Sequence, residues 1–137
     1  MATAAGVCDG LKLGDNAKAA LITRGLNEMR RLGTAAGARP ETFSGLSGMG
    51  DLTVSCFSQQ SRNRTLGERI ARGEPLETVL ASATAEGYPT ARSAKALAAR
   101  LDAPTPIIDE VHAMLYEGKD VHQAVNDLLT RNPRAEA

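Results

Sequence analysis

The sequence is poor in aromatic residues and in cysteine. It has no tryptophan, aromatic residues make up 3% of its 137 residues, and its two cysteines are Cys8 and Cys56. A core without large rings must be built from aliphatic side chains, which suits closely packed helices. Two cysteines without metal-ligand spacing exclude a disulfide-rich scaffold, so we expect reduced thiols, no metal and a cytoplasmic protein. The alternative is a single disulfide between the two.

An excess of charge and long apolar runs are also missing. The 16 basic residues balance the 16 acidic ones, so the charge gives no support for a nucleic-acid partner. No window approaches the roughly 18 consecutive apolar residues that cross a membrane. Residues 1–5 lack the positive charge with which a signal peptide begins. We therefore expect a soluble protein without a membrane span.

What the sequence does contain is a succession of helical patterns. Apolar residues at three- and four-residue spacing predict a long first helix over 16–36, in which Gly25 suggests close approach of another backbone. Residues 52–57 would fit a strand or a short helix, and the helical surroundings favour the helix. Residues 86–89 are typical of a turn. The other predicted helices cover 40–43, 61–72, 75–80, 90–101, 106–117 and 120–131. Residues 1–137 thus predict a single all-α domain of about six or seven helices.

The segment Ser61-Arg62-Asn63-Arg64 contradicts the usual preferences of a helix start. If Ser61 is the N-cap, both arginines lie in the first turn, where free N–H groups and the helix dipole favour acidic residues. A phosphate would make this arrangement favourable, because it accepts hydrogen bonds from helix N–H groups and from guanidinium groups. The alternative is a solvated turn whose arginines pair with acids elsewhere in the fold. The pattern alone leaves both hypotheses open.

A glycine-rich turn precedes Asp51. Glycines at 45, 48 and 50 predict a break in regular structure, and they allow a backbone to approach a ligand closely. An acid beside such a turn could orient a hydroxyl or an amine. The alternative is that Asp51 only caps a helix.

Six short motifs occur in an order that resembles one enzyme family. They are residues 8–11, 14–25, 48–52, 61–64, 85–87 and 115–118, which include Gly48-Met49-Gly50-Asp51-Leu52, Ser61-Arg62-Asn63-Arg64 and Leu115-Tyr116-Glu117-Gly118. Together they resemble the C-terminal domain of bacterial-type NAD(P)-dependent glycerol-3-phosphate dehydrogenase, over roughly residues 4–131. The resemblance implies a fold like the C-terminal domain of 6-phosphogluconate dehydrogenase.

The resemblance also implies a function. Such an enzyme reduces dihydroxyacetone phosphate to sn-glycerol 3-phosphate with NADH or NADPH, for phospholipid synthesis. Its cofactor binds an N-terminal Rossmann domain, and its substrate binds a helical domain like residues 1–137. The resemblance is also compatible with two such chains forming a homodimer.

The resemblance assigns roles to particular residues. Asp51 matches the active-site aspartate, and Ser55 matches a hydroxyl position close to substrate. Ser61, Arg62 and Asn63 match the substrate-binding run, with Arg62 also near the cofactor. The remaining cofactor contacts match Thr84 and Glu86.

Three departures from the family limit what we expect of this chain. The family's general acid/base lysine, in a Lys-Asn pair before Cys8, has no match here, and neither has the Rossmann domain. Lys12 and Lys18 do not fit that motif, and Tyr88-Pro89 replaces the usual hydrophobic-Arg pair. We therefore expect this chain alone to be inactive and to bind no dinucleotide tightly. The alternative is a non-enzymatic helical interaction or regulatory module derived from such a domain.

Overall fold

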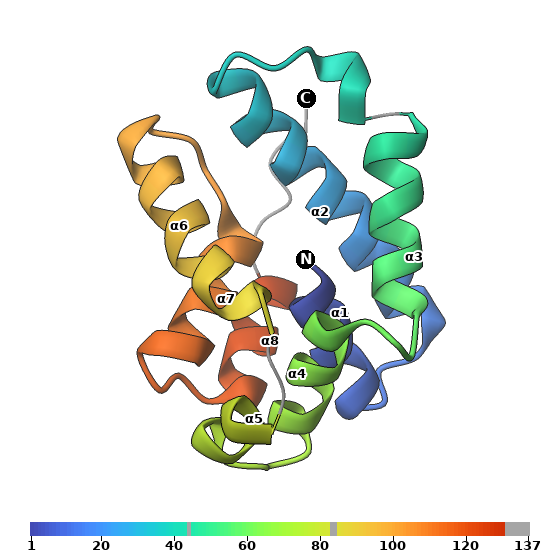
Figure 1. Cartoon of the computed structure of the whole chain (residues 1–137), viewed down its shortest axis with the longest axis vertical. Coiled ribbons are helices and arrows are strands. Elements are labelled where there is room, and N and C mark those ends of the chain that lie inside the picture. Colours follow the sequence, from blue (N-terminus) through green and yellow to red (C-terminus); the bar gives the residue numbers. More distant parts are fainter. Residues whose placement is uncertain (44, 83–84, 131–137) are drawn as a thin grey trace.

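The protein is a bundle of short helices around a central N-terminal helix (Figure 1). The structure is a computed structural model that describes residues 1–43, 45–82 and 85–130, with the backbone alone at 46 and 47. Over these residues it has eight α-helices and no strand. They are α1 (Ala2–Gly10), α2 (Asp15–Ala35), α3 (Asp51–Phe57), α4 (Arg62–Ala71), α5 (Leu76–Ser82), α6 (Gly87–Arg100), α7 (Pro106–Tyr116) and α8 (Val121–Thr130). A 3-10 helix, η1 (Pro40–Phe43), and a π-helix, η2 (Leu46–Gly50), lie between α2 and α3.

The predicted all-α class is confirmed, with two differences in detail. The structure adds α1, whose alanine-rich sequence has no polar face to reveal a helical period. Helix α6 begins at Gly87, inside the residues expected to form a turn. Pro89 is compatible with this start because the first turn of a helix needs no N–H from it. None of the described helices is long and apolar enough to cross a bilayer.

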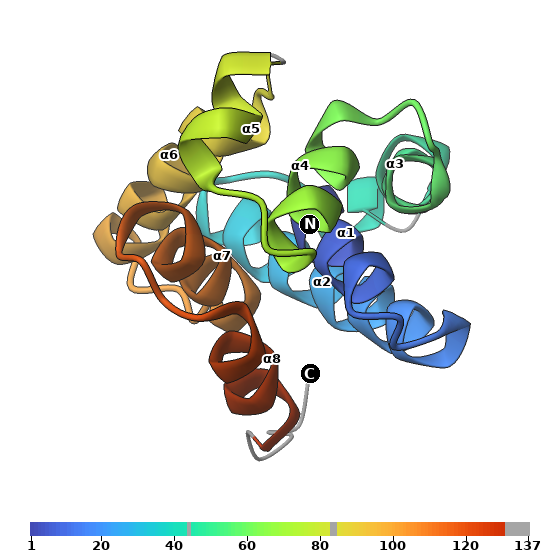
Figure 2. The ribbon, with the colours of Figure 1, turned by 90° about the horizontal axis from the view of Figure 1, so that it is seen from below.

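Helices α1 and α4 pack with their backbones in direct contact (Figure 2). A Cβ on Gly6 would overlap the carbonyl oxygen of Arg64, and one on Gly67 would overlap the carbonyl oxygen of Thr3. The close backbone approach expected at Gly25 is wrong for that residue. A Cβ on Gly25 would lie 2.9 Å from the Sδ of Met1, which is a side chain.

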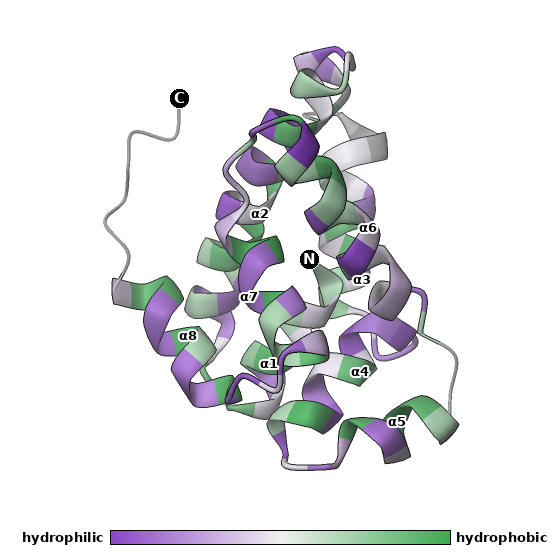
Figure 3. Cartoon of the chain, turned by 90° about the vertical axis from the view of Figure 1, so that its left-hand side faces the viewer, coloured by the Kyte–Doolittle hydropathy of each residue, from purple (hydrophilic) through white to green (hydrophobic). Residues whose placement is uncertain are grey.

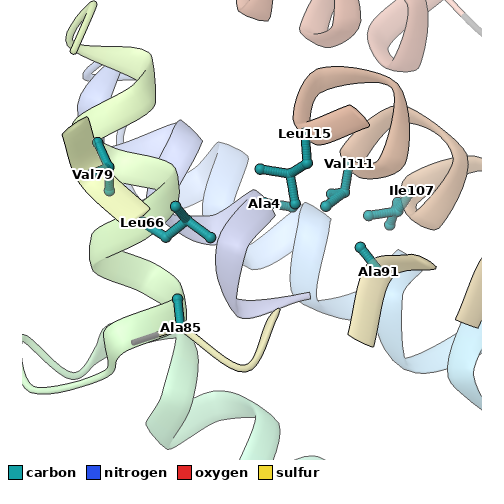
Figure 4. Close-up of a cluster of buried hydrophobic side chains, with 8 residues drawn as sticks. All are labelled: Ala4, Leu66, Val79, Ala85, Ala91, Ile107, Val111 and Leu115. Atoms are coloured by element: carbon teal, nitrogen blue, oxygen red, sulfur yellow. The ribbon is translucent and has the colours of Figure 1, made fainter. Parts of the chain in front are cut away.

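Two apolar clusters fix the other helices around this pair. Figure 4 shows the first, in which side chains of α1, α4, α5, α6 and α7 meet. A smaller cluster of Ala5, Leu52 and Cys56 holds α3 against α1 and α2. Hydrophobic and hydrophilic residues alternate along α8, which packs on α7 with Ala124 buried (Figure 3). Both clusters consist mainly of aliphatic side chains, as the composition predicts.

Replacing Gly67 by alanine should destabilise the protein strongly. The new methyl group has no room against the backbone of Thr3 and Val7, so α1 and α4 must separate. Overpacking of this kind costs on the order of 2 kcal/mol even after the better helix propensity of alanine is counted. Urea unfolding measures the loss. Gly45→Ala is the matched control, because nothing lies within 4 Å of a Cβ there, and equal stability of the two variants would contradict the packing described.

Candidate functional site

A cavity of about 420 Å³ lies where α1, α2, α3, α4, α6 and α7 meet. Its polar side chains come from four helix starts and from the middle of α3. These residues are Thr3 of α1, Asp51 and Ser55 of α3, Asn63 of α4 and Thr90 of α6. Its apolar wall includes Leu52, Ile107 and Val111. A partly apolar pocket with a few converging polar groups is the usual form of a small-molecule site.

The π-helix η2 positions Asp51 at the edge of this cavity. Five residues from Leu46 to Gly50 form the π turn, and Asp51 follows as the first residue of α3. A Cβ on Gly48 would lie 2.5 Å from the Cα of Phe43, so only glycine lets η2 pack on η1. The expected break is thus a tightly packed irregular turn, of the kind often found at functional sites. An acid at a helix start is also favoured by the helix dipole.

Helix α4 begins as the sequence predicts, with Ser61 as its N-cap. The Ser61 hydroxyl accepts a hydrogen bond from the backbone N–H of Arg64 at 3.3 Å. Two residues later, the Oδ1 of Asn63 accepts the N–H of Gly87 at 2.6 Å. This bond joins the starts of α4 and α6 and fixes the amide of Asn63 with its oxygen toward α6. A Cβ on Gly87 would lie 2.9 Å from that oxygen and from the Oγ1 of Thr3, so a larger residue would push these side chains away.

Arg62 and Glu86 form a loose ion pair beside the cavity. The Nη1 of Arg62 lies 3.7 Å from the Oε1 of Glu86, and the side chains are 62% and 61% exposed. An exposed pair of this kind contributes little to stability. Both side chains can therefore exchange partners with a ligand at little cost. Each is the sequence neighbour of a cavity-lining residue, Asn63 or Gly87.

Arg64 differs completely from Arg62, because it is buried. Its side chain is 2% exposed, and its Nη1 lies 2.7 Å from the Oδ2 of Asp9 and 2.6 Å from the Oε2 of Glu68. Lys18, also buried, shares the same oxygen of Asp9 at 2.9 Å. For Arg64 the pairing with acids expected in the alternative hypothesis is found, but its side chain is buried and not solvated. One of those acids, Glu68, lies only one turn further along α4.

The charges of this cluster stabilise one another. Burial alone would raise the pKa of Asp9, but the hydrogen bonds from Lys18 and Arg64 outweigh it and lower that pKa. Lys18 also lies over the ring of Phe57, 4.2 Å from its centre, which links α2 to α3. Lys18 does not line the cavity.

Sequence reasoning missed Glu28, a fully buried acid in the middle of α2. Its carboxylate accepts the backbone N–H groups of Ile107 and Ile108 at 2.7 and 3.0 Å, which caps the start of α7. Ile107 and Ile108 line the cavity, so this bond fixes one of its walls. Burial raises the pKa of Glu28 from its ordinary value of 4.5 to about 7, although the two N–H groups lower it. An acid on the apolar side of a helix was the signal that could have indicated such a bond.

An aromatic stack supports the start of α6. The rings of Tyr88 and Tyr116 stack with centres 4.5 Å apart, and His112 stacks on Tyr116 at 5.0 Å. The Tyr116 hydroxyl donates to the carbonyl oxygen of Tyr88 at 2.5 Å. The departure at Tyr88-Pro89 therefore provides a contact between α6 and α7.

The structure brings together most of the residues expected at the site. Asp51, Ser55 and Asn63 line one cavity, while Arg62 and Glu86 pair beside it. Ser61 caps α4 and is not among the lining residues, and Thr84 lies outside the described residues. Cys8 and Cys56 are free thiols, and burial raises the pKa of Cys8 to about 11. Within the ranges that the structure describes, no cluster of histidines, cysteines or acids could hold a metal ion.

Comparison with known proteins assigns this helical domain to a class of dehydrogenases. Residues 1–126 match the family model described as NAD-dependent glycerol-3-phosphate dehydrogenase C-terminus. The chain belongs to this family of C-terminal dehydrogenase domains.

Relatives and a solved structure agree with that family. The chain is 52% identical to glycerol-3-phosphate dehydrogenase (NAD(P)+) of Desulfotalea psychrophila, over 99% of this chain and 41% of the relative. The identity to the Chlorobium phaeobacteroides enzyme of the same name is 51%, with the same coverage. A crystal structure of glycerol-3-phosphate dehydrogenase from Coxiella burnetii superposes with a TM-score of 0.91 at 43% identity, over 95% of this chain and 41% of that one. The chain thus spans about two fifths of these proteins, 41% of each.

The raised pKa of Glu28 predicts how stability depends on pH. The folded protein binds this proton up to about pH 7, whereas the unfolded chain releases it near pH 4.5. The unfolding free energy should therefore fall as the pH rises from 4.5 through 7, by about 3 kcal/mol from this group. Glu28→Gln cannot titrate, so the difference between the two proteins' urea-unfolding profiles at pH 5 to 8 isolates Glu28. A constant difference over that range would show that the carboxylate is not buried as described.

Proposed function

We propose that this chain is the substrate-binding part of an sn-glycerol-3-phosphate dehydrogenase of the cytoplasm, which supplies glycerol 3-phosphate for phospholipid synthesis. The reaction interconverts dihydroxyacetone phosphate and sn-glycerol 3-phosphate with NAD(H) or NADP(H). One observation carries the proposal: Asp51, Ser55 and Asn63 converge on one cavity beside the exposed Arg62. The relatives' shared name supports the choice of substrate. It also favours the enzyme over the non-enzymatic module.

The phosphate group would be held at the start of α4. Arg62 is exposed and bound only loosely to Glu86, so its guanidinium can turn to a phosphate and form two parallel hydrogen bonds. The amide of Asn63 lies at the same helix start with its Oδ1 bonded to Gly87, which orients its NH2 group as the donor for a ligand. Ser61 contributes by capping the helix whose positive end faces the anion.

The carbon end of the substrate would lie toward α3. Asp51 and Ser55 are one turn apart on this helix, so their oxygens face the same part of the cavity. A carboxylate there can accept a hydrogen bond from a substrate hydroxyl and stabilise a protonated amine nearby. A serine hydroxyl can both donate to and accept from the substrate. In this proposal Asp51 is the catalytic residue of the chain.

The nicotinamide cofactor would meet this chain only at its edge. NADH or NADPH supplies the hydride when bound. Arg62 and Glu86 suit a contact with its polar groups, because both are more than half exposed and their ion pair is easily broken. Thr84 would contribute to the same edge. The nucleotide-binding Rossmann domain and the proton-donating lysine would come from outside these 137 residues, and two copies could assemble as a homodimer.

Titration with sn-glycerol 3-phosphate tests the substrate site. We expect backbone amide shifts in residues 51–66 of the labelled chain at millimolar ligand, and smaller ones with glycerol, which lacks the phosphate. Arg62→Gln should weaken binding by about thirtyfold, because a charged hydrogen bond contributes roughly 2 kcal/mol. Arg100→Gln at the far end of α6 changes the charge equally and is the control.

Two outcomes would overturn the proposal. One is an absence of shifts in residues 51–66 at millimolar ligand. The other is an equal loss of binding in Arg62→Gln and Arg100→Gln. Oxidation of NADH with dihydroxyacetone phosphate by this chain alone would contradict the assignment of the remaining groups to another domain.

A further inference from the structure

We propose that Arg64 is a positioning residue, which holds the turn between α3 and α4 and so sets the geometry of the substrate site. The inference rests on the proposed function for its ligand, but its geometry does not depend on that function. It assigns opposite roles to the two arginines of Ser61-Arg62-Asn63-Arg64. Arg62 meets the phosphate, and Arg64 never does.

The guanidinium of Arg64 is surrounded by protein oxygens. Its Nε donates to the carbonyl oxygen of Ser58 at 2.8 Å, and its Nη2 donates to the Oε1 of Gln59 at 2.9 Å. Its Nη1 meets the carboxylates of Asp9 and Glu68. With four acceptors and a side chain 2% exposed, Arg64 has no open face for a phosphate.

The bonds of Arg64 connect two parts of the protein. Asp9 belongs to α1, whereas Ser58 and Gln59 belong to the turn that leads into α4. The guanidinium therefore fastens this turn to the central helix. A lysine could replace the charge but not the connection, because one ammonium group cannot reach acceptors on both sides in the planar arrangement of a guanidinium.

The turn itself is short and determines where the site residues lie. Ser58 ends α3 in an extended conformation, and Ser61 begins α4 in another. The carbonyl oxygen of Ser58 also accepts the N–H of Ser61 at 3.3 Å. Arg64 therefore donates to the same oxygen that closes the turn. Asp51 and Ser55 lie before the turn, and Asn63 lies after it. Any change in the turn alters the distance between these two groups of cavity residues.

The first test removes the connection while keeping the charge. In Arg64→Lys, we expect the amide protons of residues 58–64 to exchange with solvent at least about tenfold faster in the absence of any ligand. Affinity for sn-glycerol 3-phosphate should fall about tenfold, because the turn no longer holds Asn63 and Arg62 in place. Unchanged exchange in residues 58–64 would overturn the proposal.

The second test uses exposed residues, whose replacement leaves the core intact. Gln59→Ala removes one bond to Arg64, whereas Gln60→Ala removes a neighbouring side chain of the same size and similar exposure. Both variants should unfold within about 2 °C of the original protein. Only Gln59→Ala should speed the exchange of the Ser61 and Arg64 amides and weaken binding, by about threefold. Identical behaviour of the two variants would contradict the proposal.

A third measurement separates positioning from direct binding. The Nε–H resonance of Arg62 should shift when inorganic phosphate or sn-glycerol 3-phosphate is added, and that of Arg64 should not. A phosphate-dependent shift of the Arg64 Nε–H comparable to that of Arg62 would make Arg64 a ligand and overturn the inference. If the original protein does not bind glycerol 3-phosphate, the proposed function fails, and ligand-free exchange in the variants still decides the role of Arg64.

Discussion

The contact between the backbones of α1 and α4 determines the arrangement of the rest of the molecule. With glycine at positions 6 and 67, no side chain separates the two helices. This closeness brings Asp9 within reach of Arg64 and places the start of α4 near the start of α6, where Asn63 meets Gly87. Helix α3 then packs on α1 and α2 through a small apolar cluster. The cavity is the space that these contacts leave between the helix starts.

Buried charge is the second feature that organises the molecule. Removing a guanidinium and two carboxylates from water is costly unless each finds partners. Here Asp9 and Glu68 share Arg64, while Lys18 bonds the same oxygen of Asp9 and Arg72 bonds the other oxygen of Glu68. The carboxylate of Glu28 is stabilised differently, by two backbone N–H groups of α7 in place of a cation. Both solutions connect helices that are distant in sequence, and the bonds of Glu28 hold one wall of the cavity.

Local features were predictable from the sequence, and distant partners were not. The N-cap at Ser61 follows from residue type and position, so it was predicted and is confirmed. The sequence could not predict that Arg62 is exposed while Arg64 is buried. The burial of Arg64 depends on its ion pair with Asp9, which is 55 residues away. Gly25 broke a helical pattern visibly, whereas Gly6 lay in a helix that the pattern did not reveal. The hydrogen bond that the N–H of Gly87 donates to Asn63 at the start of α6 is likewise one that no local rule indicates.

The position of the aromatic stack has a practical consequence for spectroscopy. The protein has two tyrosines and no tryptophan, and both tyrosines belong to the stack of α6 on α7. Apart from the weak emission of phenylalanine, the intrinsic fluorescence of the protein therefore comes from this tyrosine stack. Tyr88 directly follows Gly87 and lies two residues before Thr90, both of which line the cavity. Emission from the unmodified protein is thus a local signal from the helix start that borders the cavity, and no label needs to be introduced.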